Sequence, residues 1–176
     1  EDAAGRYAVK GAGLMPCATF TKEIAAQSDK ASNALAWIAG YLTATNANAP
    51  GTFDIVSWQS EGMVAQALNA RCNANPEEPL AQAIAAMVAT MQPDAISAEE
   101  RPVMVKVGRR ERALYPSVVT RMQKALAANN EGLSVTGSFD ESTEEALRAF
   151  QKEAKLVVTG FPDSITLYRL FESAKR

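Results

Sequence analysis

The sequence predicts a mainly α-helical protein made of two parts. Apolar residues recur at helical spacing through most of the chain, the pattern VTGxxDxxTxxxL occurs twice near its end, and a proline-bracketed segment of linker composition separates two regions. We therefore expect a helical domain over residues 1–92, a linker over 93–102 and a second helical domain over 103–176.

The front region has the periodicity of a helical bundle. Residues 17–42 predict one interrupted helix or two, and a further helix is expected from about 57 to 72, after an Asn-rich loop. The clearest amphipathic stripe has the spacing i, i+3, i+4, i+7, i+8, i+11. It consists of Leu80, Ala83, Ile84, Met87, Val88 and Met91. Trp37 and Tyr41 lie four residues apart and are expected in this core, the alternative being an exposed aromatic patch.

Two cysteines, Cys17 and Cys72, are both in register with apolar stripes, so both are expected to point into the front core. Two states fit this position. A disulfide would stabilise the fold by about 4 kcal/mol through loop closure and would indicate an oxidising compartment. The alternative is a pair of buried free thiols, since Cys is among the most buried residue types.

The duplicated pattern predicts two similar turns, each followed by a helix. Each copy has a glycine for a left-handed turn, an aspartate three residues later as the helix N-cap, and a threonine whose hydroxyl bonds back toward the cap. These residues are Gly137, Asp140 and Thr143 in the first copy and Gly160, Asp163 and Thr166 in the second. With a helix expected over about 116–129, they complete a small three-helix core.

The tail resembles a known family. The residues that carry the resemblance are the runs Met122-Gln-Lys-Ala-Leu126, Gly137-Ser-Phe-Asp-Glu-Ser-Thr143, Ala146-Leu-Arg-Ala-Phe-Gln151 and Leu156 to Thr166. Together they resemble the peptidoglycan-binding domain type 1 over about 115–172. The resemblance implies a three-helix, noncatalytic module that tethers a hydrolase or another envelope protein to the cell wall. The sequence departs from the family pattern at 129–137, where two closely spaced glycines are usual in a loop that borders the ligand.

The front half loosely resembles small helical periplasmic domains of proteobacteria. The shared features are Cys17, the run Trp37-Ile-Ala-Gly40-Tyr41-Leu42 with Asn46, and Cys72 shortly before Asn75-Pro76. This group includes acid-stress chaperones and the immunity proteins that block type VI amidase toxins. The resemblance implies a disulfide between Cys17 and Cys72.

The composition argues against an enzyme. The chain has no His, which removes Ser-His-Asp and Cys-His triads and the common metal sites. A glycosidase-type carboxylate pair is the remaining alternative, but the acidic doublets 77–78, 99–100 and 144–145 lie at expected helix starts or in the linker, where carboxylates favour the helix dipole. We expect no catalytic activity, no cofactor and no metal.

The expected ligand-binding residues surround the two turns of the tail. They are Ser138, Arg148, Gln151, Thr159, Asp163 and Arg169. Arg148 and Gln151 are placed off the apolar stripe, where a guanidinium can bind a stem-peptide carboxylate and an amide can pair with N-acetyl groups. Helix capping is the competing role of Asp163. The short basic run of Arg109, Arg110 and Arg112 is expected either against an anionic ligand or on solvated surface.

The charge is divided along the chain. Residues 1–102 carry 6 Lys and Arg against 11 Asp and Glu, a net −5, whereas residues 103–176 carry 12 against 9, a net +3. The basic half either meets an anionic partner or presents a solvated face. Nucleic acid is not expected as the partner, because no aromatic side chains interleave the basic run. No apolar run approaches the length of a membrane span.

Together these observations predict an envelope protein, periplasmic or secreted by a bacterium and already without its signal peptide. We expect it to bind peptidoglycan through its C-terminal module and to present its N-terminal domain to a cell-wall hydrolase or another exported protein. The alternative is a periplasmic inhibitor, immunity factor or chaperone for an exported enzyme, with the C-terminal module serving as a protein-interaction surface.

Overall fold

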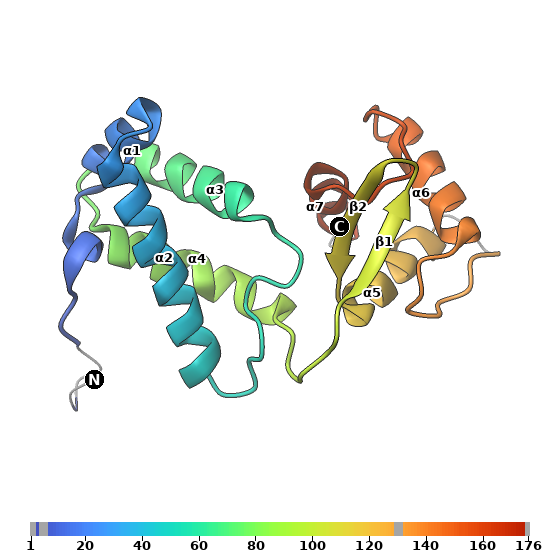
Figure 1. Cartoon of the computed structure of the whole chain (residues 1–176), viewed down its shortest axis with the longest axis horizontal. Helices are drawn as coiled ribbons and strands as arrows, with labels where there is room; N and C mark the ends of the chain where they lie inside the picture. Colours follow the sequence, from blue (N-terminus) through green and yellow to red (C-terminus); the bar gives the residue numbers. More distant parts are fainter. Residues whose placement is uncertain (1–2, 4–6, 129–131, 175–176) are drawn as a thin grey trace. The chain divides into compact units, whose positions relative to one another are not determined.

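The computed structural model describes residues 3, 7–128 and 132–174 and is mainly helical, as the sequence predicts. The chain divides into two compact units (Figure 1). Unit 1 comprises Glu1–Val56 and Ser60–Ala98, and unit 2 comprises Ser57–Gln59 and Glu99–Arg176. Part of the loop in which the sequence departs from the family pattern, residues 129–131, lies outside the described residues.

Unit 1 is a helical bundle. Its elements are the 3₁₀ helix η1 (Gly11–Leu14), the α-helices α1 (Cys17–Ala26), α2 (Asp29–Asn48), α3 (Glu61–Ala74) and α4 (Leu80–Met91), and the 3₁₀ helix η2 (Gln92–Asp94). The stretch expected as one interrupted helix or two forms two helices. Gln27 ends α1 in the left-handed region (φ 50°), and Ser28 caps α2 by accepting a hydrogen bond from the Ala31 N–H (3.2 Å).

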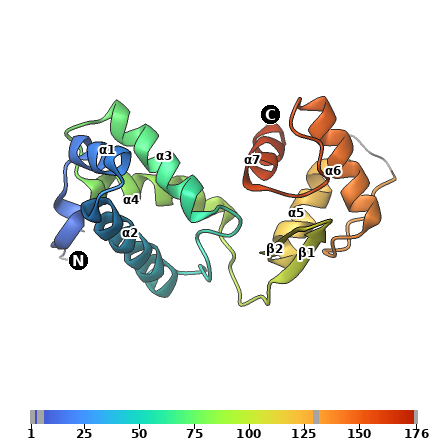
Figure 2. The same ribbon diagram turned by 45° about the horizontal axis from the view of Figure 1, so that its top comes forward.

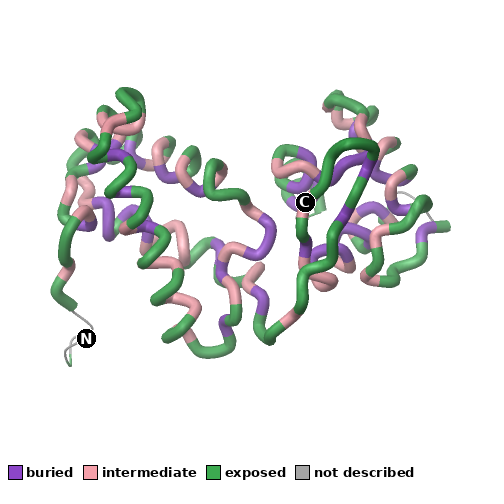
Figure 3. Tube along the Cα trace, in the orientation of Figure 1, coloured by how far each residue is buried: buried purple, intermediate pink, exposed green. Residues whose placement is uncertain are grey.

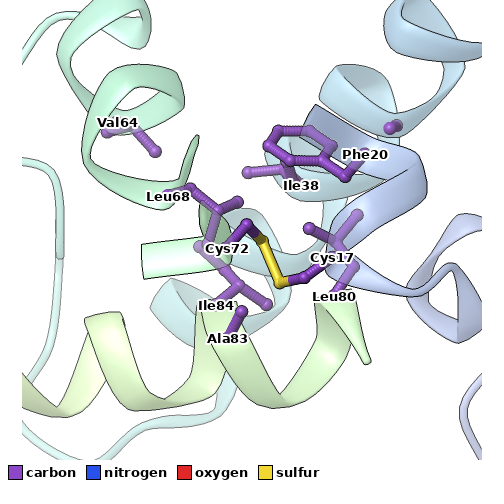
Figure 4. Packing of buried hydrophobic residues seen from close by; sticks show 10 residues of the cluster. Cys17, Phe20, Ile38, Val64, Leu68, Cys72, Leu80, Ala83 and Ile84 are labelled. Carbon is purple, nitrogen blue, oxygen red and sulfur yellow. A yellow bond between two sulfur atoms is a disulfide. The ribbon is translucent and has the colours of Figure 1, made fainter. Parts of the chain in front are cut away.

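A disulfide between Cys17 and Cys72 joins α1 to α3 at the centre of unit 1 (Figure 4). The Cα atoms of the two residues are 4.6 Å apart, and both side chains are buried. Phe20, Leu68 and Leu80 pack around the bridge and are fully buried. The free-thiol alternative is therefore wrong, and the implied bridge is confirmed.

The aromatic pair of α2 lies against this core. Trp37 and Tyr41 are partly buried, pack on the core cluster and have ring centroids 5.6 Å apart. Gly13 of η1 lies so close to Trp37 that an added Cβ would come within 2.3 Å of the indole ring. The expectation that these two side chains belong to the core is thus confirmed.

The segment after α4 packs on the loop that follows α2. The Ile96 carbonyl accepts hydrogen bonds from Phe53 N–H (2.6 Å) and Asp54 N–H (3.1 Å), and Ile96 N–H donates to the Asp54 carbonyl (2.8 Å). Ile96 itself is buried, and Gln92 donates to the Thr52 hydroxyl at 2.7 Å. The first half of the stretch expected as a linker therefore contributes to unit 1.

The described residues of unit 2 form three helices and a two-stranded hairpin beside them (Figure 2). Its elements are β1 (Val103–Val107), β2 (Arg110–Leu114), α5 (Pro116–Ala127), α6 (Glu141–Glu153) and α7 (Ser164–Ser173). The antiparallel register pairs Val103 with Leu114 and Val107 with Arg110. The sequence pattern does not predict β2, because its charged residues conceal a period-2 pattern in which Leu114 is buried.

The core of unit 2 forms where α5 contacts both α6 and α7. Its fully buried side chains come from all three helices, as the buried stretches in Figure 3 show. They include Val119, Met122, Leu147, Leu167 and Leu170. The apolar faces expected on the three helices of the tail therefore meet as predicted.

A tryptophan distant in sequence completes this unit. Trp58 is 7% exposed, and its ring meets the Phe171 ring edge-on with centroids 5.3 Å apart. Arg112 donates to the Trp58 carbonyl (2.9 Å) and to the Pro162 carbonyl (2.8 Å). The third helix expected from residue 57 accordingly begins only at Glu61, after Ser60 as its N-cap.

Arg112 differs from the expected solvated or ligand-binding arginine. Burial lowers the pKa of its guanidinium, while the charge of Asp163 acts in the opposite direction. Both carbonyl contacts are internal to unit 2, so the side chain is a structural link.

Among the described helices, none combines the length and apolar character that a bilayer crossing requires.

The disulfide makes unit 1 sensitive to reduction. Replacing Cys17 and Cys72 by Ser should lower its free energy of unfolding by about 4 kcal/mol, because the 55-residue separation is no longer closed in the unfolded chain. Urea unfolding with and without dithiothreitol measures this effect. A midpoint that neither the double substitution nor the reductant changes would contradict the prediction.

Candidate functional site

A buried glutamine holds the first of the two duplicated turns. Gln123 of α5 has no exposed surface, and its Oε1 accepts hydrogen bonds from Thr136 N–H (2.9 Å) and Gly137 N–H (2.8 Å). Its Nε2 donates to the Ser138 carbonyl (2.8 Å) and to the Thr143 hydroxyl (2.9 Å). One side chain thus pairs with both the turn and the first turn of α6.

Gln151 of α6 makes the same set of bonds to the second turn. Its Oε1 accepts from Thr159 N–H and Gly160 N–H, both at 2.8 Å. Its Nε2 donates to the Phe161 carbonyl and the Thr166 hydroxyl, both at 3.1 Å. The two turns are therefore copies in their hydrogen bonding as well as in their sequence.

This arrangement corrects the placement of Gln151. Gln151 is expected off the apolar stripe, with its amide directed at a ligand, but the side chain has no exposed surface. Thr159 is likewise engaged inside the turn, where its hydroxyl accepts from Phe161 N–H (3.1 Å) and from Gln151 (3.2 Å). Both residues shape the second turn from within.

The expected helix caps are confirmed. Asp140 accepts hydrogen bonds from the Thr143 hydroxyl (2.5 Å), from Thr143 N–H (2.8 Å) and from the Ser142 hydroxyl (2.9 Å). These bonds, led by that from the Thr143 hydroxyl, lower the pKa of Asp140 because they favour its ionised form. Asp163 accepts from Thr166 N–H at 2.8 Å, so the capping role of this predicted ligand residue is the one observed.

Both turns need glycine. Gly137 has φ +76° and Gly160 has φ +71°, in the left-handed region that disfavours other residues. The second turn is also covered closely, since a Cβ on Gly160 would lie 2.7 Å from Glu144 Cγ and 2.8 Å from Arg148 Nε. Arg148 in turn pairs with Glu144 at 2.6 Å, so this predicted ligand residue forms an ion pair over the second turn.

The first turn borders an open pocket of about 750 Å³. The pocket lies between α5, the turn and the segment before β1. Its polar lining consists of Glu100, Arg101, Ser117, Thr120, Arg121, Lys124, Thr136 and Ser138. Of the expected ligand residues, Ser138 lies here.

The pocket is positively charged at its rim. Arg101 and Lys124 are exposed, and Glu100 accepts a hydrogen bond from Ser117 N–H at the start of α5 (3.0 Å). The third cation, Arg121, lies over the Phe171 ring at 4.1 Å from its centroid. The Ser117 hydroxyl is buried and has no hydrogen-bond partner among the described residues. The lining therefore combines cations, hydroxyls and one unused buried polar group.

The two turns differ in what covers them. Thr120 precedes Gln123 by three residues, as Arg148 precedes Gln151, so the two side chains occupy corresponding positions. A Cβ on Gly137 would lie 3.0 Å from the short side chain of Thr120, whereas the longer Arg148 covers the second turn. This difference leaves the first turn accessible from α5.

Arg169 lies in a third place. With Phe150, Ala154, Tyr168, Glu172 and Ser173 it lines a hollow of about 400 Å³ between α6 and α7. Tyr168 is 49% exposed there. The predicted ligand residues are thus not gathered in one site: Ser138 lies at the first turn, Arg169 lies in this hollow, and the others cover or form the second turn.

Most of the first-turn pocket is not predicted from the sequence. Arg101 falls in the segment expected as a linker, and Ser117, Thr120 and Lys124 are expected only as part of a helix. A signal was present, because polar residues at 117, 120 and 124 recur at i, i+3 and i+7 on one face of α5.

The hydrogen bonds from Gln123 and from Gln151 to their turns form two glutamine clamps, and loss of one clamp should destabilise unit 2. Gln151→Leu leaves the N–H groups of Thr159 and Gly160 and the Phe161 carbonyl without this partner, which should cost about 3 kcal/mol in free energy of unfolding. Urea unfolding of the full chain measures the loss. Lys152→Leu, at an exposed neighbour on the same helix, is the matched control. Equal stability of the two variants would refute the clamp.

The cap at Asp140 should make stability depend on pH. Because the folded-state pKa is lowered, its contribution is present above the unfolded pKa of about 4 and is lost as the pH falls through the folded-state pKa. Asp140→Ala should cost about 1 kcal/mol at pH 7. Asp140→Asn keeps a capping oxygen but cannot ionise, so it should be less stable than wild type at neutral pH and equally stable in strong acid. Urea unfolding measures the free energy of unfolding of Asp140→Asn and of wild type at each pH. A difference between them that is constant with pH would contradict this assignment.

Comparison with known proteins identifies the segment that contains both turns. No curated protein and no solved structure matches the chain significantly. The family model that does match covers α5, α6 and most of α7, in agreement with the resemblance found in the sequence. Residues 116–170 match the family described as a putative peptidoglycan binding domain.

Proposed function

We propose that unit 2 binds peptidoglycan at the pocket beside the first turn. The observation that carries this proposal is an open, cation-rimmed pocket within and next to the segment that matches the putative peptidoglycan binding domain. The second turn has the same backbone arrangement but is covered by the ion pair of Arg148 and Glu144. The first turn is therefore the better candidate.

The pocket offers groups that suit the wall polymer. Peptidoglycan carries carboxylates on its stem peptides and hydroxyl and N-acetyl groups on its glycan. Arg101 and Lys124 can bind a carboxylate, with the guanidinium able to do so through two parallel hydrogen bonds. The hydroxyl of the exposed Ser138 can donate to or accept from the sugar substituents.

We further propose that the protein acts by binding and not by catalysis. The chain has no His to carry protons at neutral pH. Members of the acidic doublets serve structural roles: Glu78 pairs with Arg71 at 2.7 Å, Glu100 accepts from the N-terminus of α5, and Glu144 pairs with Arg148. These interactions favour structural carboxylates over an acid and base pair.

The proposed location is the bacterial envelope, in the periplasm or outside the cell. The Cys17–Cys72 disulfide supports an oxidising compartment, and the putative peptidoglycan binding domain supports proximity to the wall. Unit 1 would then be presented at the wall to an exported partner such as a hydrolase. In the alternative role, as an inhibitor, immunity factor or chaperone, unit 2 would itself bind protein.

Sedimentation with purified sacculi tests the binding proposal. We expect the full chain to pellet with the sacculi, and Arg101→Glu or Lys124→Glu to weaken this binding at least about tenfold, because each reverses a rim charge. Lys152→Glu makes the same charge change on an exposed face of α6 and should bind like wild type.

Two results would count against the proposal. Sedimentation that is equal for all three variants would remove the pocket as the site, and no sedimentation of the wild-type chain would favour the protein-binding alternative. A clearing zone on a cell-wall zymogram would contradict the noncatalytic role.

A further inference from the structure

Unit 1 contains an apolar groove of about 580 Å³ that the proposed wall binding does not use. One wall is a stripe along α2. Its lining positions 35, 38, 39, 42, 43 and 46 follow the helical spacing i, i+3, i+4, i+7, i+8 and i+11, and Ala36 lines the groove beside them. The other wall comprises the start of α3 and the chain before it, including Val56 and Val64. The volume is in the range of pockets that bind ligands.

Two of the four α3 residues that line the groove are small. Gly62 and Ala65 face it from α3, and an added Cβ on Gly62 would meet only the Ser60 hydroxyl, at 3.9 Å. On the facing wall, Leu35 remains 39% exposed although it is a large apolar residue. Small residues on one side and exposed leucine on the other allow close approach of a further helix.

The charge around the groove selects its occupant. The charged residues among its described lining are Asp54 and Glu61, and no Lys or Arg is among them. Residues 1–56 and 60–98 carry five Lys and Arg against nine Asp and Glu, a net charge of −4. An anionic lipid head group or a second copy of this acidic unit would be repelled, whereas a basic group beside an apolar surface would be attracted.

We propose that this groove binds an amphipathic helix of a partner protein, with apolar residues against Leu35 and Leu42 and a Lys or Arg toward Glu61. The stripe on α2 runs from position 35 to position 46, an axial rise of about 16 Å, which matches about three turns of a bound helix. The proposal is independent of wall binding, which uses unit 2.

A synthetic helix with Leu on one face and Lys on the other is the probe, with a counterpart in which Glu replaces every Lys. The Leu–Lys helix should bind the full chain one to one and shift the NMR methyl signals of Leu35, Leu42 and Val56. The Leu–Glu helix should bind at least about tenfold more weakly, a difference of about 1.4 kcal/mol.

Two matched glycine substitutions distinguish binding in the groove from non-specific attraction of the helix to unit 1. Gly62→Leu projects a side chain into the groove and should weaken binding at least about tenfold. Gly40→Leu adds the same side chain to an exposed position of α2 with no heavy atom within 4 Å, and should bind like wild type. Both variants should keep the wild-type circular dichroism, because Leu favours helix over Gly.

A charge reversal provides a second variant. Glu61→Lys should weaken the Leu–Lys helix and strengthen the Leu–Glu helix, since it changes the sign at the groove rim. This variant keeps the test decisive if Gly62→Leu does not fold.

Several outcomes would overturn the proposal. Equal affinity for the two helices, or unchanged binding by Gly62→Leu, would do so. If dodecanoate shifted the same methyl signals more strongly, the groove would be assigned to an acyl chain. If the chain dimerised and Gly62→Leu abolished the dimer, a second copy would be the occupant. Failure of sacculus binding would leave this result untouched.

Discussion

Unit 2 depends on the hydrogen bonds made by two buried side-chain amides, those of Gln123 and Gln151. Each amide oxygen accepts two backbone N–H groups, and each amide nitrogen donates to a carbonyl and a threonine hydroxyl. Buried polar groups are costly unless they are paired, so each amide and its turn stabilise each other. The geometry of the first-turn pocket follows from this pairing.

The duplication then diverges at its surface. The two clamps are alike, but Thr120 and Arg148 take corresponding positions and leave one turn accessible and the other covered. A duplicated framework can thus keep the same backbone in both copies while the surface of the two copies differs. The residues that fix the backbone of the repeat are separate from the residues that cover or expose its turn.

Sequence periodicity predicted the elements whose contacts are local. The stripe of α4, the caps at Asp140 and Asp163, and the left-handed glycines were all visible because each depends on residues within one or two turns. The disulfide required more, since its pairing was only one of two states until the resemblance of the front half favoured it.

The features that sequence analysis missed depend on distant contacts. Gln151 is polar and is therefore expected on the surface, although its buried side chain has partners eight to fifteen residues further along the chain. Arg112 belongs to a charged run, and its acceptors are the carbonyls of Pro162 and Trp58, which are 50 and 54 residues away. Periodicity carries no information about such partners. The first-turn pocket escaped for the same reason, because Arg101 reaches it from a segment with linker composition.

The position of Trp58 affects how the tail can be studied in isolation. A fragment cut at the compositional boundary would contain all three tail helices but would leave Phe171 without its aromatic neighbour and Arg112 without one of its two acceptors. Such a fragment would expose apolar surface around Phe171 and would be prone to aggregate. Its failure to remain in solution would say nothing about its affinity for the wall.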